Sequence, residues 1–597
     1  MSANSIPQSR GWSLNSRTLA IASALGLGSV LIYWFYRCRN RNDCEQKSVS
    51  ILEKAEKKKA QGVEAYRRKD FKEAIRLFGD AIDELRKVSK ESSEQLDEAK
   101  IGELMSLCEN NNAACYDELG NTERCLDHCN LALQIKPNYE KAMRRRARTH
   151  FKLGHNDKAM NDYLDLTFME NVSKESRNTY HVELDRVAEA TISPLLNEIF
   201  QDKIGKPMKI PQMMVCEWMI STVTNDPLLA RMNKLTNDLN DDKTRWISAL
   251  DDALLALKRG EYDEIASLAV AIINDETHEI VDRILAVLLA ARFLFYQTLK
   301  EPAMKTMQQF EHFWDKLDEA QKLAHKDIHV AHITLQVTLT DLVENESLSN
   351  EENYKIDETA KQRCHQLVEE GLRINPKNVD PLVNLKNLIS LNNFPHIFGY
   401  FWFIFQRAKK LDQKNPFIRY YEINASLSIA IRQQTFLDIQ NQMFMLQQIL
   451  TDSENVPVFA FIFLSKFAML LHNNQIVLEA CKKTLEKMPN CAYAIYLLGL
   501  VDMSERLDLS QVVQSMENAM RKAIEADPNY WEPYRIMGKI CGEKKKFAQA
   551  SDFFSTALSL ARKRDEMMVL LKEQLMINTF AKRDERSEYF PRDMAMK

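Results

Sequence analysis

The sequence has few of the residues that end helices and form turns. Its 597 residues include only 15 Gly and 16 Pro, about 5% of the chain where average usage gives roughly 12%. Short strands need frequent turns, so this scarcity argues against a sandwich or barrel of many strands. It favours one helix after another, and the length suits three to five domains or one elongated repeat array.

Paired cysteines and an excess of positive charge are also missing. The eleven cysteines are scattered and none forms a C-x-x-C pair; Cys125 and Cys129 stand four residues apart, as on one helix face. This usage indicates a reducing compartment and no disulfide framework. The net charge of −4 excludes a globally basic nucleic-acid binder, and we expect no nucleic-acid partner.

Sequence signatures of catalysis are absent. The chain has no phosphate-binding G-x-x-x-x-G-K-[ST] motif, nucleophile elbow or kinase set. His325, His329 and His332 follow the spacing of one helix face and form a possible metal triple. No H-E-x-x-H pattern accompanies them, so we expect three surface histidines. The sequence predicts a binding protein that is not an enzyme and has no cofactor or metal.

One uncharged run lies near the N-terminus. Residues 18–36 carry no charge and end in Tyr33, Trp34 and Tyr36. About 20 such residues cross a bilayer core as a helix, and aromatic rings favour its interface. We predict a short tail at 1–17, a transmembrane signal-anchor at 18–36 and a linker at 37–50. A cleaved secretory signal is the alternative, and the bulky aromatics and arginines that follow the run disfavour it.

A helix-pair period begins after the linker. The 34-residue tetratricopeptide pattern has small or large apolar residues at positions 8, 20, 24, 27 and 32. Position 8 falls on Gly62, Ala113 and Ala147 in three repeats, and the later positions hold Ala74, Phe78, Ala81, Cys125, Cys129, Ala132, Ala159 and Tyr163. Residues 86–102 are inserted between the first two repeats. We expect this insertion to lengthen helices or to form a loop.

The same period returns near the C-terminus. Gly499 and Gly538 each follow a proline at the required spacing, and Ala550, Phe554 and Ala557 complete the last repeat. Repeats stack because one helix pair cannot bury its apolar face alone.

The predicted fold is therefore all-α. We expect a tetratricopeptide-repeat superhelix in two arrays, with one N-terminal transmembrane helix. A three-repeat domain occupies 51–170, a helical connector 171–240 and a C-terminal array 241–597. Gly205 and Pro207 stop helices within the connector. The polar stretch at 344–352 is expected to form a loop.

Polar residues recur at corresponding positions of the first three repeats. Lys59 lies in the first repeat and Asn111 in the second, while Lys141 and Arg145 share a helix face in the third. These cations and the amide suit two neighbouring carboxylates, through charge-assisted hydrogen bonds worth roughly 1.5–3 kcal/mol each. Solvated surface charge is the alternative, because three further arginines crowd the same helix.

These motifs resemble the family of 70-kDa preprotein import receptors of the mitochondrial outer membrane. The resemblance rests on residues 59–62, 110–116, 141–147 and 159–166, together with the anchor and the long array. It implies a site for the C-terminal EEVD tails of the 70- and 90-kDa heat-shock chaperones, formed by Lys59, Asn111, Lys141 and Arg145.

Val63 departs from the family pattern. The family has Asn at this position, and Val63 removes one donor and acceptor to the tail's terminal carboxylate. We expect this change to weaken tail binding by about 1 kcal/mol.

The C-terminal array resembles the preprotein-binding region of the family. It is rich in Met, Phe and Leu at 436–445 and 459–471, and Met-rich surfaces adapt to varied apolar partners, although most of these residues are expected in the core. The resemblance implies a single-pass receptor of the mitochondrial outer membrane. The bulk of the chain would face the cytosol and pass preproteins to other translocase subunits. The alternative is a membrane-anchored co-chaperone scaffold on the endoplasmic reticulum or peroxisome.

Overall fold

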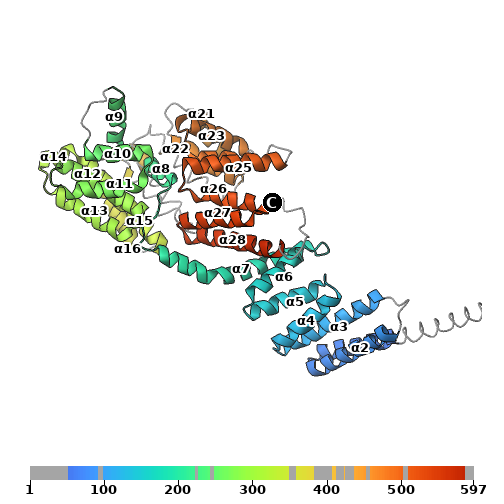
Figure 1. Ribbon diagram of the computed structural model, residues 1–597. Coiled ribbons are helices and arrows are strands. Elements are labelled where there is room, and N and C mark those ends of the chain that lie inside the picture. Colours follow the sequence, from blue (N-terminus) through green and yellow to red (C-terminus); the bar gives the residue numbers. More distant parts are fainter. Residues whose placement is uncertain are drawn as a thin grey trace, which may run out of the picture. The chain divides into compact units, whose positions relative to one another are not determined.

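The computed structural model describes residues 51–91, 98–221, 226–241, 248–347, 358–378, 406–411, 436–451, 458–501 and 509–584, with single positions between 380 and 426. Every regular element in these ranges is an α-helix (Figure 1). The predicted anchor at 18–36, with its tail and linker, lies outside them. Within the described ranges no helix combines the length and apolar character needed to span a bilayer.

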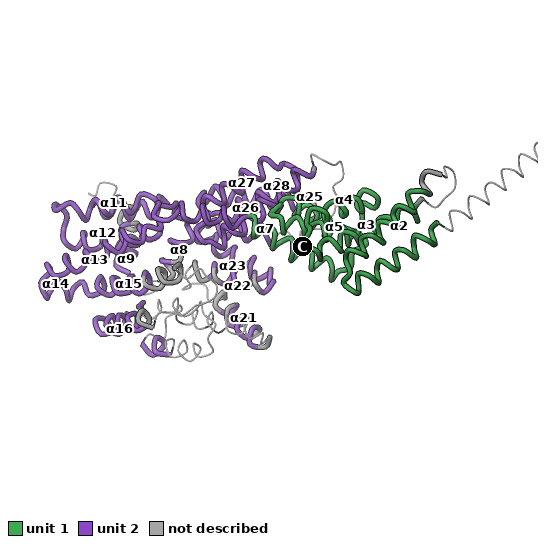
Figure 2. Tube along the Cα trace, turned by 90° about the horizontal axis from the view of Figure 1, so that it is seen from below, with its two compact units in different colours: residues 1–191 green, residues 192–597 purple. Residues whose placement is uncertain are grey.

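The chain divides into two compact units, residues 1–191 and 192–597 (Figure 2). The division falls inside α7 (Lys174–Lys203), within the segment where the sequence predicts a connector. Unit 1 contains a helix at residues 51–67, then α2 (Phe71–Glu91), α3 (Glu98–Glu118), α4 (Thr122–Ile135), α5 (Glu140–Lys152) and α6 (Asn156–Phe168). The predicted insertion lengthens α2 and α3, and residues 92–97 between them lie outside the described ranges.

Helix pairs form in unit 1 because the repeat positions bury small residues against large ones. A Cβ atom added to Gly62 would lie 2.7 Å from the Phe78 ring, so the ring of Phe78 on α2 packs directly against the backbone of the first helix there. Ala74 and Ala81 beside Phe78 are fully buried. The turns inside the second and third pairs use Gly120 and Gly154 at positive φ, which a side chain disfavours. The predicted helix-pair period is thus confirmed here.

Unit 2 continues the helical series. Its described helices are α8 (Gln212–Ser221), α9 (Pro227–Asp241), α10 (Ala249–Arg259), α11 (Tyr262–Asn274), α12 (Ile280–Tyr296), α13 (Lys300–Trp314), α14 (Glu319–Ala324), α15 (Lys326–Ser347), α16 (Glu358–Ile374), α21 (Phe436–Thr451), α22 (Val458–Leu470), α23 (Asn474–Lys487), α24 (Ala492–Val501), α25 (Leu509–Ala526), α26 (Trp531–Glu543), α27 (Phe547–Leu560) and α28 (Arg564–Asp584). At the predicted last repeat, a Cβ atom on Gly538 would meet the Phe554 ring at 2.8 Å, which confirms the pairing of α26 with α27.

Two sequence-based expectations are wrong in unit 2. The predicted loop at 344–352 does not begin where expected, because α15 remains helical through Ser347. The three histidines are not three surface residues of one helix. His325 follows α14 as its C-cap residue, and His332 on α15 is only 2% exposed.

The Met- and Phe-rich segments lie mainly in the core where they are described. Phe461, Ile462 and Leu464 of α22 are each at most 2% exposed. Phe444 of α21 differs, since it is 61% exposed.

A strap at residues 204–212, which is non-helical as far as residue 211, connects distant parts of unit 2. Its Gly205 and Pro207 stop α7, as predicted, and Gln212 then begins α8. The Gln212 backbone N–H donates to Asp527 Oδ2 at 2.7 Å, and its side chain binds the backbone of residues 490 and 492. The Asn529 side chain donates to the Ile210 carbonyl at 3.2 Å. These bonds satisfy backbone groups that the missing helix leaves free, so the segment is held in place.

Lys203, the last residue of α7, adds a further connection in unit 2. Its ammonium donates to the carbonyls of Leu558, Ser559 and Ala561 at 2.6–2.9 Å. These carbonyls lie at the C-terminal end of α27, where a positive charge is favourable.

Candidate functional site

The predicted binding residues gather on the first helices of the three pairs in unit 1. The helix at 51–67 packs on α3 through Ala55, Ala65, Leu104 and Cys108, all buried in one apolar cluster. Arg145 joins α5 to α3 on the other side. The three helices that carry Lys59, Asn111, Lys141 and Arg145 therefore lie beside one another in chain order.

Arg145 is fixed by hydrogen bonds to α3. Its Nη1 donates to the Asn110 carbonyl at 3.1 Å and also to the Asn110 side-chain oxygen. Asn110, which is 4% exposed, in turn donates through Nδ2 to Tyr139 Oη at 3.2 Å. This chain of bonds orients a half-buried guanidinium, and an oriented guanidinium loses little conformational entropy when it binds a carboxylate.

Lys59 and Lys141 carry charges that nothing neutralises within the described part of the chain. Lys59 is half-buried, and its charge opposes the rise that burial causes in the pKa of Cys108 on α3. Lys141 is exposed on the first turn of α5. Neither ammonium forms an ion pair or hydrogen bond with a described residue. Together with Arg145 they leave a basic surface available to an anion.

The crowded arginines of α5 separate into different roles. Arg146 donates to both carboxylate oxygens of Asp162 at 2.8 and 2.6 Å and to Asn130 at 3.0 Å. It ties α5 to α6 and to α4, so it is a structural residue. Arg148 is exposed. Of these three arginines, Arg145 is the one held toward α3.

Two acidic side chains of α3 are already paired with residues of other helices. Glu109 lies 2.6 Å from His128, and Asp117 lies 2.7 Å from Lys152. These pairs limit competition for Lys59 and Lys141 from acids of the chain itself, so the surface retains its attraction for an external carboxylate.

Two tyrosines supply neutral hydroxyls beside Arg145. Burial raises the pKa of Tyr139, and burial together with the nearby Glu118 raises the pKa of Tyr66; Arg145 opposes both shifts. Tyr66 donates to Glu118 at 3.4 Å. Both phenols stay protonated at neutral pH and keep their capacity to donate.

The sequence pattern does not single out Asn110 and Tyr139. Residues 110–112 are all Asn, so composition and spacing give no means of telling which side chain faces α5. Asn111, the predicted contact, is half-buried and makes no side-chain hydrogen bond to the described residues. It is therefore free to bind a ligand, while Asn110 holds Arg145. Val63 packs against the apolar cluster around Phe78.

Acidification is expected to destabilise α5 through His150. This side chain is 8% exposed and its Nδ1 has no hydrogen-bond partner, and burial lowers its pKa. Below the usual histidine pKa of about 6.5 the unfolded state takes up a proton that the folded state resists, so stability falls with pH by at most ~1.4 kcal/mol per unit. Hydrogen exchange of α5 amides in the full chain, compared with His150→Phe at each pH, measures this loss.

The wild-type chain and His150→Phe share the same chemical exchange rate at a given pH. A difference between their exchange rates therefore reports a difference in the stability of α5. We expect α5 of the wild-type chain to lose protection relative to the variant as pH falls from 7 to 5. Equal changes in the two chains would show that His150 does not cause the pH dependence.

No protein-family model matches the chain. A human protein, sperm-associated antigen 1, is 34% identical over 105 residues, which make up 18% of this chain; the chain spans only 10% of that relative's length. The crystal structure of yeast Tom70 aligns with 89% of this chain and 96% of its own at 14% identity and a TM-score of 0.43.

A second solved structure is shorter. The TPR2AB-domain:pHSP90 complex of yeast Sti1 aligns with 56% of this chain and 98% of its own at 12% identity and a TM-score of 0.23. Because both TM-scores are below 0.5, neither alignment establishes a common overall fold. The assignment of tetratricopeptide-type helix pairs rests on the buried repeat positions of this chain.

Proposed function

We propose that unit 1 binds the acidic C-terminal tail of a chaperone. The observation that carries this proposal is the placement of Lys59 on the first, and of Arg145 and Lys141 on the third, of three neighbouring helices, with Asn110 of the middle helix already orienting Arg145. A peptide that ends in Asp offers two carboxylates close together, which match an oriented guanidinium and two unpaired ammonium groups. The EEVD tails of the 70- and 90-kDa heat-shock chaperones have this chemistry.

The proposal extends to an import receptor of the mitochondrial outer membrane. In this function residues 18–36 anchor the chain in the membrane, unit 1 receives chaperones that carry preproteins, and unit 2 binds internal targeting segments of the preproteins before other translocase subunits take them. The support is the resemblance of the sequence motifs, together with the uncharged run and its arginine flanks. A binding function without catalysis also agrees with the absence of catalytic motifs from the sequence.

A peptide titration tests the binding step. The full chain in detergent is titrated with a fluorescent peptide that ends in EEVD, and with the same peptide carrying a C-terminal amide. We expect the free acid to bind and the amide to bind at least tenfold more weakly, because it lacks one carboxylate. If neither peptide binds, or if both bind equally, unit 1 does not recognise the C-terminal carboxylate of a peptide.

Cell fractionation with protease treatment of intact organelles tests the location. The expected result is a mitochondrial chain whose large C-terminal part is removed by external protease. If the chain is found in microsomes or peroxisomes instead, the assignment as an import receptor is wrong. The protein would then be a co-chaperone scaffold on that membrane.

A further inference from the structure

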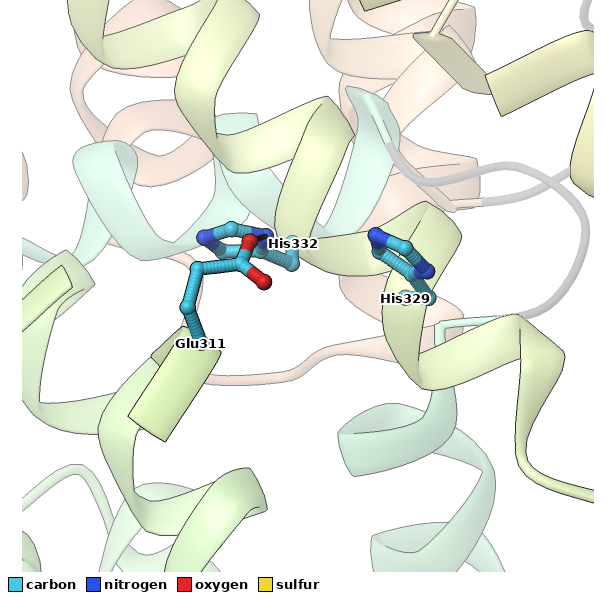
Figure 3. A group of neighbouring side chains, drawn as sticks. All are labelled: Glu311, His329 and His332. Carbon is cyan, nitrogen blue, oxygen red and sulfur yellow. Dashed lines mark ion pairs between the residues drawn. The ribbon is translucent and has the colours of Figure 1, made fainter. Parts of the chain in front are cut away.

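Three side chains with metal-ligand chemistry meet in unit 2, far from the basic surface in sequence. Glu311 lies on α13, and His329 and His332 lie on α15 (Figure 3). One ligand atom from each side chain lies within 4.8 Å of the others. Two imidazoles and a carboxylate on two packed helices are a common donor set for divalent transition metals.

His332 is positioned as a ligand rather than as an ordinary core residue. It is 2% exposed, and its Nδ1 is buried without a hydrogen-bond partner. Its ring stacks on Phe310 with centroids 3.7 Å apart and planes 7° apart, which fixes the orientation of the ring. A buried nitrogen that lacks a partner calls for a physical reason, and a metal ion would supply the missing bond.

The other ring nitrogen of His332 lies beside a side-chain amide. Its Nε2 is 3.4 Å from Gln336 Nε2, a nitrogen that can only donate. Rotation of the Gln336 amide by 180° exchanges its nitrogen for its oxygen, so that Nε2–H of His332 donates to this oxygen when Nδ1 binds an ion. Metal-binding histidines are held in this way by an acceptor on the second nitrogen.

The distance between His332 and Glu311 leaves room for an ion. Glu311 Oε1 lies 3.9 Å from His332 Nδ1, which is too long for a hydrogen bond. A zinc ion with ligands at about 2.0–2.2 Å in tetrahedral geometry holds donor atoms about 3.3–3.5 Å apart. The Glu311 side chain is 61% exposed, so it can close the small difference, and its exposure gives an ion access from solvent.

The surroundings are negatively charged. Glu370 of α16 and Asp315 after α13 both raise the pKa of Glu311 through their charge, after burial as the largest cause. Glu370 also acts on His329, where the nearby Lys322 opposes it. Three carboxylates near two neutral imidazoles create a local field that a dication would relieve.

We propose that Glu311, His329 and His332 bind a divalent transition-metal ion of the zinc class, which joins α13 to α15 in unit 2. Glu370 or water completes the coordination. The ion would hold the two helices together.

Cobalt binding to the full chain tests the site, because Co²⁺ replaces Zn²⁺ and absorbs visible light. The metal-free chain, prepared with a chelator, is titrated with CoCl₂, and the visible absorption and bound metal are measured. Glu311→Gln and His329→Gln remove one ligand each from partly accessible positions, so folding is expected to persist; circular dichroism checks it. His312→Gln is the matched control, because His312 is exposed on α13 next to Glu311.

We expect one Co²⁺ with tetrahedral absorption in the wild-type chain and in His312→Gln, displaced by an equivalent of Zn²⁺. Each ligand variant should bind Co²⁺ at least tenfold more weakly. Absence of Co²⁺ binding by the wild-type chain would overturn the proposal. Equal binding by all four chains, or a sulfur-to-cobalt charge-transfer band that marks cysteine ligands, would overturn it as well.

Discussion

The Arg145→Ala variant is expected to bind an EEVD peptide ten- to a hundredfold more weakly than the wild-type chain. A charge-assisted hydrogen bond contributes roughly 1.5–3 kcal/mol, and each 1.4 kcal/mol is a factor of ten in Kd. Arg145 is fixed by Asn110 before any ligand arrives, so its loss removes a contact whose orientation the fold already provides. Fluorescence anisotropy with the full chain measures the change.

Arg148→Ala is the charge-matched control for this prediction. Arg148 lies on the same helix, is exposed and makes no hydrogen bond or ion pair with the described residues. Its loss should change Kd less than threefold at moderate ionic strength, because long-range attraction is screened there. If Arg148→Ala and Arg145→Ala weaken binding equally, the peptide is attracted by net charge and no specific clamp exists. Circular dichroism must show that both variants keep their helices.

Variants of Asn110 and Asn111 distinguish a residue that contacts the peptide from one that positions Arg145. Asn111→Ala should weaken peptide binding without changing stability, because the side chain has no intrachain bond to lose among the described residues. Asn110→Ala should affect both properties, since it removes the support of Arg145 and a bond to Tyr139. The opposite pattern would mean that Asn110 contacts the peptide directly.

Asp226→Ala is expected to lower the free energy of unfolding of unit 2 by about 3–5 kcal/mol. Asp226 lies 3.8 Å from Arg292, and their side chains are only 2% and 7% exposed. The Arg292 Nε and Nη1 atoms have no hydrogen-bond partner, so Asp226 and the Trp218 ring, 4.1 Å from the guanidinium, are what stabilise the charge. Removal of Asp226 leaves a buried cation without its counter-charge, which is more costly than loss of the carboxylate alone.

Asp226 also organises the segment around it. It accepts hydrogen bonds from the backbone N–H groups of Leu228 and Leu229 at the start of α9, and from Trp218 Nε1 at 3.1 Å. Denaturant unfolding of the full chain, followed by tryptophan fluorescence, measures the loss. Asp252→Ala is the control, because Asp252 is exposed in the first turn of α10 and should cost at most about 1 kcal/mol. Similar losses in both variants would show that the buried pair contributes no special stability.

The sequence predicts the helix pairs well because the repeat is a local pattern. Gly62 and Phe78 are close enough in the chain for their spacing to reveal that they meet, and Gly538 and Phe554 repeat the arrangement. Charged residues at equivalent positions of successive pairs likewise indicate neighbouring helices. These inferences need only the period and the size of the side chains.

Other features depend on contacts that no local pattern records. Three successive asparagines at 110–112 differ only by rotation about α3, and packing decides which one meets Arg145. The partner of Asp226 is more than sixty residues away in sequence, on α12. His332 has the polarity of a surface residue, and its burial follows from the way α15 packs on Phe310. In each case tertiary structure overrides the expectation from residue type.

The strap at 204–212 has a consequence for synthesis of the chain. Its hydrogen-bond partners at Asn490, Asp527 and Asn529 follow 278 to 319 residues later. At about 5–20 residues per second, the ribosome needs roughly 15–60 s to make that stretch. The helices of unit 1 are complete before this interval begins, so unit 1 can fold while the strap still lacks its partners. A nascent chain that stops before Asn490 would retain unit 1 but leave Ile210 and Gln212 without these bonds, an unfinished surface that a quality-control protease can recognise.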